Sequence, residues 1–449
     1  MHQLRSLSNT RVGFHYFSDT LHFRESDLLA WLPELRALGA AWLTIQAPEE
    51  RAIPEFFLRG LLEAGIEPIL HFHLPLDGST RDRSLQLLFE SYARWGAQYV
   101  SLFDRPNQRS SWPAMSWTQA DLVERFLDLF LPVAVAALEA GLTPVFPPLE
   151  PGGDYWDTAF LRAALRGLQR RGHSRLLDKL ILGAYAWTGN RPLNWGAGGP
   201  ERWPGARPYF TPAGVQDQVG FRIFDWYLTL ARAELGQSRP ILLLKAGCLP
   251  NDRAGTQASA GTQADSLAWH TQANLALARL MAGEAGISAG QADQLEAVPA
   301  EVLACNFWLL AAAPESPYTS QAWFHPSGSS LPAVNAFHQW AEARQIQTRT
   351  NQVHRYPGAA HTRTGPLIAH YLLLPIYGWG VPDWHLDGLR PFIKEFHPTI
   401  GFSLVEAANA GRVTVVGGEQ AYPEEALQTL RNAGCTVERM IGDGTLIAT

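Results

Sequence analysis

The chain alternates between short apolar runs and segments in which apolar residues recur at helical spacing. The first run, residues 12–17, is followed by a helix-like segment at 25–38 that ends at a glycine. The same succession is found eight times, and the last helix is expected at residues 331–344. The predicted strands are residues 12–17, 41–47, 68–74, 99–103, 143–146, 180–187, 240–245 and 302–310.

The predicted strands are almost continuously apolar, which is typical of parallel strands that are covered on both faces. Strands that alternate with helices indicate a parallel α/β architecture. Eight such units in about 345 residues favour a closed (β/α)₈ TIM barrel over an open sheet. In that fold the polar residues at the carboxyl ends of the strands carry the chemistry, so we expect the functional site there.

A second, smaller pattern follows the eight units. The helical periodicity lapses from Gln345 to Thr364, and we interpret residues 346–364 as a linker. Strands are then predicted at 367–374, 399–404, 412–416 and 436–441, with helices between them. We therefore expect a barrel over residues 1–345 and a small α/β, flavodoxin-like domain over 365–449, each with its own core.

Composition narrows the class of protein. A chain of 449 residues with 46% hydrophobic and 17% charged residues is globular and long enough for two domains. The net charge of −6 and the lack of a basic run argue against nucleic acid as a partner. Three widely spaced cysteines form neither a disulfide framework nor a zinc motif, so they do not indicate the compartment. We expect no cofactor.

Neither a signal peptide nor a membrane span is evident in the sequence. Residues 1–10 are polar, and no stretch reaches the apolar length that a membrane span needs. We expect a soluble protein with no membrane span. The compartment is left open, and export followed by loss of a signal is compatible with the sequence.

The fourth predicted strand stops abruptly in residues 104–107, Asp-Arg-Pro-Asn. Proline cannot donate to a sheet and disfavours a helical residue before it, so Pro106 ends the strand. This segment resembles the fourth strand of the clan A glycoside hydrolase barrels, which ends in Asn-Glu-Pro-Asn and is commonly followed by a tryptophan. Pro106, Asn107 and Trp112 match that pattern. The resemblance implies a sugar-binding barrel.

The residues that the resemblance makes decisive depart from the family. Asp104 stands in place of asparagine, and Arg105 stands in place of the acid/base glutamate. The nucleophilic glutamate that ends strand seven is replaced by Lys245. Arginine cannot release a proton in a protein, and lysine cannot capture an oxocarbenium ion as a carboxylate does. The pair of carboxyls that glycoside hydrolysis requires is therefore absent from its usual positions.

Three functions remain open. The first is a carbohydrate-binding protein of glycoside hydrolase ancestry that binds an oligo- or polysaccharide, with Asp104 in an ion pair with Arg105 or Lys245. The second is an active glycoside hydrolase that uses Asp104 and Glu150 as its catalytic carboxylates. The third is a lyase or aldolase in which Lys245 forms a Schiff base. An unpaired, buried Lys245 would favour the third function.

Further candidate ligand-binding residues lie at other strand ends. His15 and His73 end strands one and three, and we expect them to donate to sugar hydroxyls. Metal coordination by this pair has no evident third ligand, so we expect no metal. We expect His71 to point to the other side of its strand.

Aromatic and amide side chains complete the expected sugar site. The sequence has sixteen tryptophans, and flat rings stack on the apolar faces of sugars. Trp187 and Trp308 close strands six and eight, and in the resembled barrels a tryptophan after strand eight forms a sugar platform. We expect both, together with Asn107, to bind substrate.

The end of the chain carries a second resemblance. Residues 413–421 hold a valine-rich run and Gly-Gly, and residues 437–443 read Val-Glu-Arg-Met-Ile-Gly-Asp. This arrangement resembles a unit of the bacterial cell-wall-binding repeat family, which implies a cell-wall polymer as a partner of the C-terminal domain. The alternative is an ordinary flavodoxin-like domain.

Overall fold

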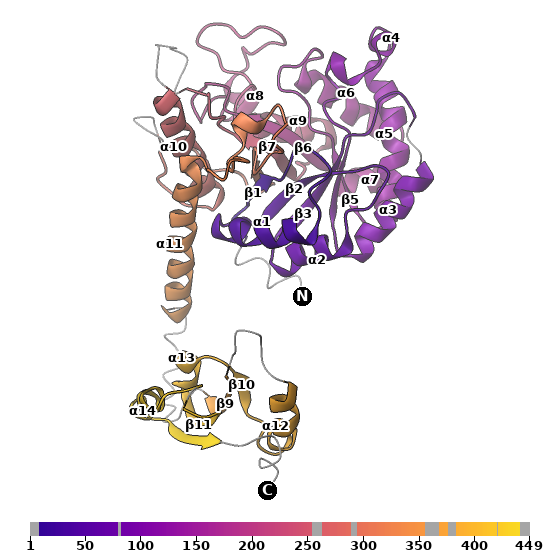
Figure 1. Cartoon of the computed structure of the whole chain (residues 1–449). Helices are drawn as coiled ribbons and strands as arrows, with labels where there is room; N and C mark the ends of the chain where they lie inside the picture. Colours follow the sequence, from indigo (N-terminus) through magenta and orange to yellow (C-terminus); the bar gives the residue numbers. More distant parts are fainter. Residues whose placement is uncertain are drawn as a thin grey trace. The chain divides into compact units, whose positions relative to one another are not determined.

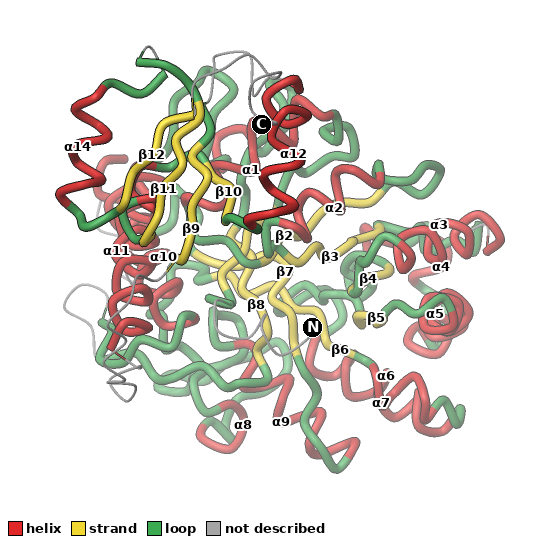
Figure 2. Tube along the Cα trace, turned by 90° about the horizontal axis from the view of Figure 1, so that it is seen from below, coloured by secondary structure: helices red, strands yellow, loops and turns green. Residues whose placement is uncertain are grey.

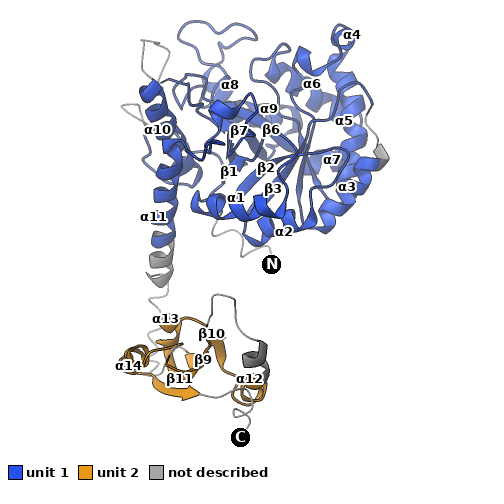
Figure 3. Ribbon diagram, viewed as in Figure 1, with its two compact units in different colours: residues 1–348 blue, residues 349–449 orange. Residues whose placement is uncertain are grey.

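The protein consists of two compact units, residues 1–348 and 349–449 (Figures 1 and 3). The computed structural model describes residues 9–79, 82–253, 263–288, 294–354, 368–375, 383–419 and 421–440. Within these residues, no helix has the length and apolarity needed to cross a membrane.

The first unit contains a closed barrel of eight parallel strands in sequence order, in which β8 pairs with β1 (Figure 1). This confirms the predicted TIM barrel. The strands are β1 (Val12–His15), β2 (Trp42–Ala47), β3 (Glu67–Phe72), β4 (Tyr99–Leu102), β5 (Thr143–Phe146), β6 (Ile181–Trp187), β7 (Ile241–Gly247) and β8 (Val302–Phe307).

Helices lie outside the strands, as Figure 2 shows for α3, α5, α6 and α7. Two helices lie between β5 and β6 in the chain, because Gly172 takes a left-handed conformation with φ of 73° and interrupts the helical segment. The outer helices are α1 (Glu25–Ala37), α2 (Glu55–Glu63), α3 (Asp82–Arg94), α5 (Leu122–Glu139), α6 (Asp157–Arg170), α7 (Ser174–Lys179), α9 (Ile223–Leu235), α10 (Gln263–Met281) and α11 (Pro332–His354). Short helical turns interrupt the loops at η1 (Arg109–Ser111), α4 (Ala114–Trp117), α8 (Gly199–Arg202) and η2 (Thr319–Gln321).

Apolar side chains fill both sides of the barrel wall. Outside, the strands and helices share one large core, in which rings such as Phe14, Phe307 and Trp323 pack edge to face or tilted. Inside, a separate apolar cluster fills the barrel. Its buried members are Trp42, Ile69, Val145, Ile181, Tyr185, Leu242, Leu244 and Ala304. The barrel is therefore a packed core, and polar chemistry is confined to its carboxyl-end mouth.

Strand β7 contains an irregularity that matters for the site. Ala184 pairs with Leu243, but the next residue of β6, Tyr185, pairs with Lys245, so Leu244 is an extra residue. Leu244 belongs to the apolar cluster inside the barrel, and the Lys245 ammonium lies 4.8 Å from the centre of the Tyr185 ring. Two consecutive residues therefore face the interior, as a β-bulge allows.

The last helix of the first unit is longer than the sequence pattern indicated. Helix α11 runs to His354 and therefore includes residues 346–354, which we assigned to the linker. Its first half is anchored in the barrel core by the buried Val334 and Phe337. The remainder of the expected linker, residues 355–364, lies outside the described residues.

The second unit is a four-stranded parallel sheet with strand order β10-β9-β11-β12. In sequence order this is 2-1-3-4, the order of the first four strands in flavodoxin-like folds. The strands are β9 (Ile368–Leu373), β10 (Thr399–Gly401), β11 (Ala410–Val416) and β12 (Thr436–Met440), and the helices are α12 (Asp383–Phe396), α13 (Leu404–Ala407) and α14 (Glu424–Asn432).

Alternate residues of β9 enter two different cores of this second unit. Tyr371 and Leu373 pack in one cluster, whereas Leu372 and Leu374 pack with Leu389 of α12 in the other. Both faces of the sheet are thus covered, which confirms the predicted small α/β domain. The resemblance to a cell-wall-binding repeat stays a prediction, because its last residues, 441–443, are outside the described part.

Candidate active site

Side chains from five strands meet at the carboxyl-end mouth of the barrel. The His15 and Trp308 rings, from the ends of β1 and β8, lie 4.6 Å apart. The Lys245 ammonium from β7 is 4.6 Å from the centre of the Trp308 ring. The Tyr185 hydroxyl of β6 donates a hydrogen bond to Asp104 after β4. Several of the strand-end residues that were named from the sequence, His15, Asp104, Lys245 and Trp308, therefore lie close together in the structure.

Arg105 links the two candidate catalytic carboxylates. Its Nε donates to Asp104 Oδ2 at 3.1 Å, and its Nη1 donates to Glu150 Oε2 at 3.4 Å. The other Asp104 oxygen, Oδ1, accepts the Tyr185 hydroxyl at 2.5 Å. Arg105 takes a left-handed φ of 46°, which is uncommon for a residue with a side chain. The expected Asp104–Arg105 ion pair is thus present, and Glu150 shares it.

The charges around Asp104 keep this carboxyl ionised. Burial by itself raises its pKa, but positive charges outweigh burial and hold the pKa well below its usual range. These are the charge of Lys245, those of His73 and His71 once low pH protonates their rings, and that of Arg105. An acid with so low a pKa carries no proton near neutral pH. Asp104 is therefore unable to act as a general acid, although it can stabilise a nearby positive charge.

Lys245 is buried at the mouth, with 9% of its surface exposed. Its ammonium lies over the rings of Tyr185 and Trp308, an arrangement that stabilises a cation. Within the described part of the chain, its Nζ has no hydrogen bond and no carboxylate within 4.0 Å, so the expected ion pair with Asp104 is not formed. Burial lowers the pKa of Lys245, and the more distant charge of Asp104 opposes this effect.

The expectation that His71 points away from His73 is wrong. Residues two apart on a strand point to the same face, and the two rings lie 4.4 Å apart. His71 Nε2 lies 3.0 Å from the Phe103 carbonyl oxygen, so it carries the proton and donates to that carbonyl. Burial lowers the pKa of His71 to about 4, which keeps its ring neutral at neutral pH.

His15, the other expected hydroxyl donor, is fully buried. Neither of its ring nitrogens has a hydrogen-bond partner among the described residues. The same holds for Nε2 of His73. These unsatisfied buried polar atoms indicate a place where a ligand group or water would complete the hydrogen bonding.

His71, His73 and Asp104 offer donor atoms that all lie within 4.8 Å of one another. Two imidazoles and one carboxylate are a donor set that divalent transition metals accept. However, Arg105 already pairs with this carboxylate, and the Lys245 charge acts on it as well. Two fixed positive charges oppose the binding of a divalent cation. The expected absence of a metal stays a prediction, although its original reason, the lack of a third ligand, no longer holds.

Asn107 serves to join two loops. It is fully buried, and its Nδ2 donates to the backbone oxygens of Glu150 and Tyr155 at 2.9 and 3.0 Å. Its Oδ1 accepts from the Glu150 backbone nitrogen at 2.8 Å. Each hydrogen of its amide nitrogen is therefore engaged within the protein. Asn107 positions the backbone of Glu150, whereas the sequence had suggested direct contact with substrate.

The two expected sugar platforms differ in access. Trp308 is 5% exposed, and its Nε1 donates to Gln321 Oε1 at 2.7 Å. Lys245 lies over its ring, where a sugar would otherwise stack. Trp187 is half-buried and stands nearly perpendicular to Trp308, with ring centres 6.3 Å apart. Trp187 is therefore the ring that remains accessible to a ligand.

Tyr185 is a residue of the site that the sequence pattern did not single out. It precedes Trp187 by two positions on β6, so the alternation of a strand would have placed both on the same face. Burial and the charge of Asp104 raise the pKa of Tyr185 well above its usual value, which keeps its hydroxyl protonated. It is therefore a fixed donor to Asp104.

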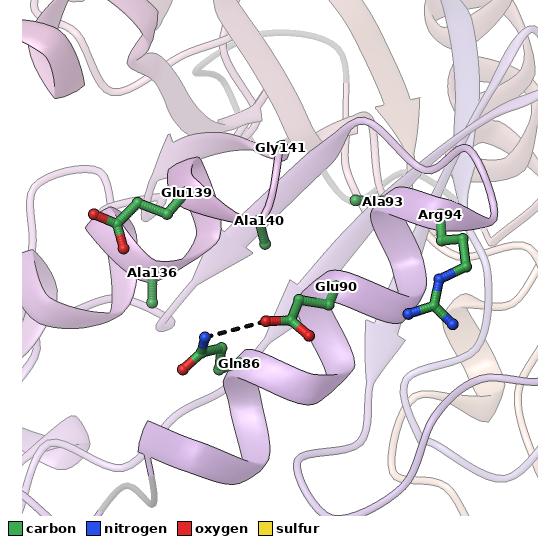
Figure 4. A pocket seen from close by; sticks show the side chains of 8 residues that line it. All are labelled: Gln86, Glu90, Ala93, Arg94, Ala136, Glu139, Ala140 and Gly141. Atoms are coloured by element: carbon green, nitrogen blue, oxygen red, sulfur yellow. Dashed lines mark hydrogen bonds between the residues drawn. The ribbon is translucent and has the colours of Figure 1, made fainter.

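A separate hollow of about 590 Å³ lies on the outside of the barrel, between α3 and α5 (Figure 4). Gln86 donates a hydrogen bond to Glu90 across one wall of it. Its lining residues are Gln86, Glu90, Ala93, Arg94, Ala136, Glu139, Ala140 and Gly141. None of the candidate residues of the mouth contributes to it.

Comparisons with known proteins yield likenesses of architecture only. No family model matches the chain, and no curated protein matches its sequence. Among solved structures, a family 39 glycoside hydrolase from Bacteroides cellulosilyticus WH2 is similar with 9% identity and a TM-score of 0.45; the match covers 74% of this chain and 63% of that one. The chain thus spans somewhat less than two thirds of that protein's length.

Two further structures show the same level of similarity. A GH128 endo-β-1,3-glucanase from Sorangium cellulosum has 14% identity and a TM-score of 0.40, over 73% of this chain and 97% of that one. A β-galactosidase from Marinomonas ef1 has 10% identity and a TM-score of 0.44, over 96% and 75%. Likenesses at these values carry no argument about activity.

Proposed function

We propose that this chain is a carbohydrate-binding protein, built on a barrel of glycoside hydrolase type, that has lost the usual catalytic pair. The observation that carries the proposal is the ion-pair network of Arg105, which engages Asp104 and Glu150 together. A cation replaces the acid/base glutamate, and a second cation, Lys245, replaces the nucleophile.

The electrostatics of the network argue against hydrolysis by the remaining carboxylates. Glycoside hydrolysis needs one carboxyl that donates a proton and a second that acts as nucleophile or base. The pKa of Asp104 is held too low for proton donation. Glu150 is paired with the same guanidinium, so one oxygen of each carboxylate is engaged by Arg105. Hydrolysis would require the arginine to leave.

The chemistry of the mouth suits the binding of a sugar. Trp187 offers a partly exposed ring for stacking. The buried His15 and the partly buried His73 offer nitrogens with unused hydrogen-bonding capacity. Carbohydrate hydroxyls both donate and accept hydrogen bonds, so they can satisfy neutral imidazoles of either tautomer. An oligo- or polysaccharide is therefore the ligand class that we favour.

A glycan-binding screen, run in parallel with hydrolysis of matched aryl glycosides, tests the proposal. We expect binding with negligible turnover, and weaker binding by about 1 kcal/mol for Trp187→Ala because a stacking ring is lost. The control is Trp95→Ala, a partly buried tryptophan that directly follows α3 and lies four positions before the start of β4, at the opposite end of the barrel. It should leave binding unchanged.

Clear multiple-turnover hydrolysis by the wild-type chain would refute the proposal. The second candidate, an active glycoside hydrolase, would then gain support if Asp104→Asn or Glu150→Gln abolished turnover. These substitutions remove one negative charge each while keeping the side-chain shape. They therefore separate a catalytic carboxylate from one that only balances Arg105.

A further inference from the structure

Lysine is rare in this chain, and its placement is selective. The sequence contains three lysines, Lys179, Lys245 and Lys394, and the other members of its 36 cationic residues are arginines. Lys179 and Lys394 are exposed, whereas Lys245 is buried in the barrel mouth. A guanidinium is always charged, but an amine can lose its proton and act as a nucleophile. The one buried cation at the end of β7 is thus of the type that can react.

The surroundings of Lys245 differ from those of a structural ion pair. Among the described residues, its Nζ makes no hydrogen bond and no ion pair within 4.0 Å. Tyr185 and Trp308 present their rings to it at 4.8 and 4.6 Å. Burial disfavours the charged amine, in keeping with its lowered pKa, while the two ring faces and the charge of Asp104 act in the opposite direction. Lys245 keeps a residual exposure of 9%.

A negative charge and a fixed hydroxyl stand next to this amine. Asp104 interacts electrostatically with Lys245 from beyond ion-pair distance, and the Tyr185 hydroxyl is bound to Asp104. A protonated imine is positively charged, so the Asp104 carboxylate is placed to stabilise it.

We propose that Lys245 forms an imine with a ligand carbonyl, namely the open-chain aldehyde of a reducing sugar. The inference rests on the proposed carbohydrate function and specifies which end of the sugar enters the mouth. It assigns Lys245 a covalent role.

The chemistry balances without an oxidant or a reductant. The neutral Nζ attacks the carbonyl carbon, a carbon–nitrogen bond forms, and the carbonyl oxygen becomes a hydroxyl by taking one proton from the nitrogen. The second nitrogen proton and the hydroxyl then leave as water, and a carbon–nitrogen double bond remains. Protonation of that nitrogen gives the cation that faces Asp104.

Reductive trapping tests the inference directly. The full chain is incubated with glyceraldehyde and cyanoborohydride, which converts an imine into a stable secondary amine without consuming the free aldehyde. The modified peptides are then mapped by mass spectrometry. We expect the adduct on Lys245 before it is seen on Lys179 or Lys394, which serve as internal standards in the same molecule. Lys245→Arg keeps the positive charge and should lose this adduct, whereas Lys179→Arg should keep it.

The outcomes separate the inference from the function on which it rests. If Lys245 is modified no faster than the two exposed lysines, the imine proposal is refuted. This measurement uses the wild-type chain, so it does not depend on the folding of a variant. Glycan binding without an adduct leaves the carbohydrate function standing and refutes the imine. An adduct on Lys245 without glycan binding supports the imine and refutes the proposed function.

Discussion

Replacing Asn107 with alanine should loosen the contact between the loops after β4 and β5. The substitution removes one acceptor and two donors that hold the backbone groups of Glu150 and Tyr155. A hydrogen bond of this kind contributes about 1 kcal/mol, and a buried group left without a partner costs about 1–3 kcal/mol. Glu150 and Tyr155 are only half-buried, so water will restore some of these bonds. We expect a loss of about 2–4 kcal/mol in the free energy of unfolding.

Urea denaturation followed by tryptophan fluorescence measures this loss as a shift of the midpoint. The matched control is Gln86→Ala, which removes an exposed amide with one side-chain hydrogen bond on α3. Such a pair on a helix surface contributes about 0.2–0.5 kcal/mol. Asn107→Asp adds a sharper test, because it keeps the acceptor but sets a carboxylate against two carbonyl oxygens. If Asn107→Ala were no more destabilising than the control, the structural role of this amide would be refuted.

Three further predictions address charge, pH and packing. Introducing the glutamate pair of the resembled barrels by Arg105→Glu with Lys245→Glu should not produce hydrolysis of aryl glycosides, because added carboxyls beside Asp104 raise one another's pKa values. Turnover by the double variant would contradict this. Burial raises the pKa of Asp157 to about 6, above its ordinary 3.8, so the folded state binds a proton more tightly than the unfolded state. The free energy of unfolding should therefore fall as pH rises from about 4 to about 6. Urea titrations of Asp157→Asn should lack this pH dependence. Gly13→Ala should destabilise the barrel by about 1–3 kcal/mol in the same assay, because the new methyl meets Asn306 Oδ1 and lies 2.7 Å from the Trp42 carbonyl oxygen. An unchanged free energy of unfolding would contradict this, because it would show that the neighbouring strands move apart without cost.

Periodicity was sufficient to predict the barrel, because each strand is buried on both faces and each helix shows an apolar stripe. Strand β5 has the predicted bounds, Thr143–Phe146, and the other strands differ only at their ends. Helix α11 was cut short because its second half, residues 345–354, is polar and shows no stripe. Its residues include good helix formers such as Gln and Arg, so intrinsic propensity favours a helix that continues to His354.

The site was predictable only in part. The motif at residues 104–107 located the mouth, and the ion pair of Asp104 with Arg105 followed from opposite charges on adjacent residues. The distance between Lys245 and Asp104 depends on how β4 and β7 tilt across the barrel. The local sequence around each residue does not determine this distance. The engagement of Asn107 by backbone groups depends likewise on a loop 43 residues away.

The extra residue in β7 has a consequence for how this site could have arisen. Because Leu244 is the unpaired position, Lys245 pairs with Tyr185 whether or not that leucine is present. Deleting its codon would leave the amine pointing into the mouth and would withdraw one apolar side chain from the interior cluster that includes Tyr185. Insertion of a single codon can thus add an apolar side chain to the barrel interior below a polar residue. The side chain of that polar residue still points into the mouth. Reactivity and orientation at this position can therefore evolve separately.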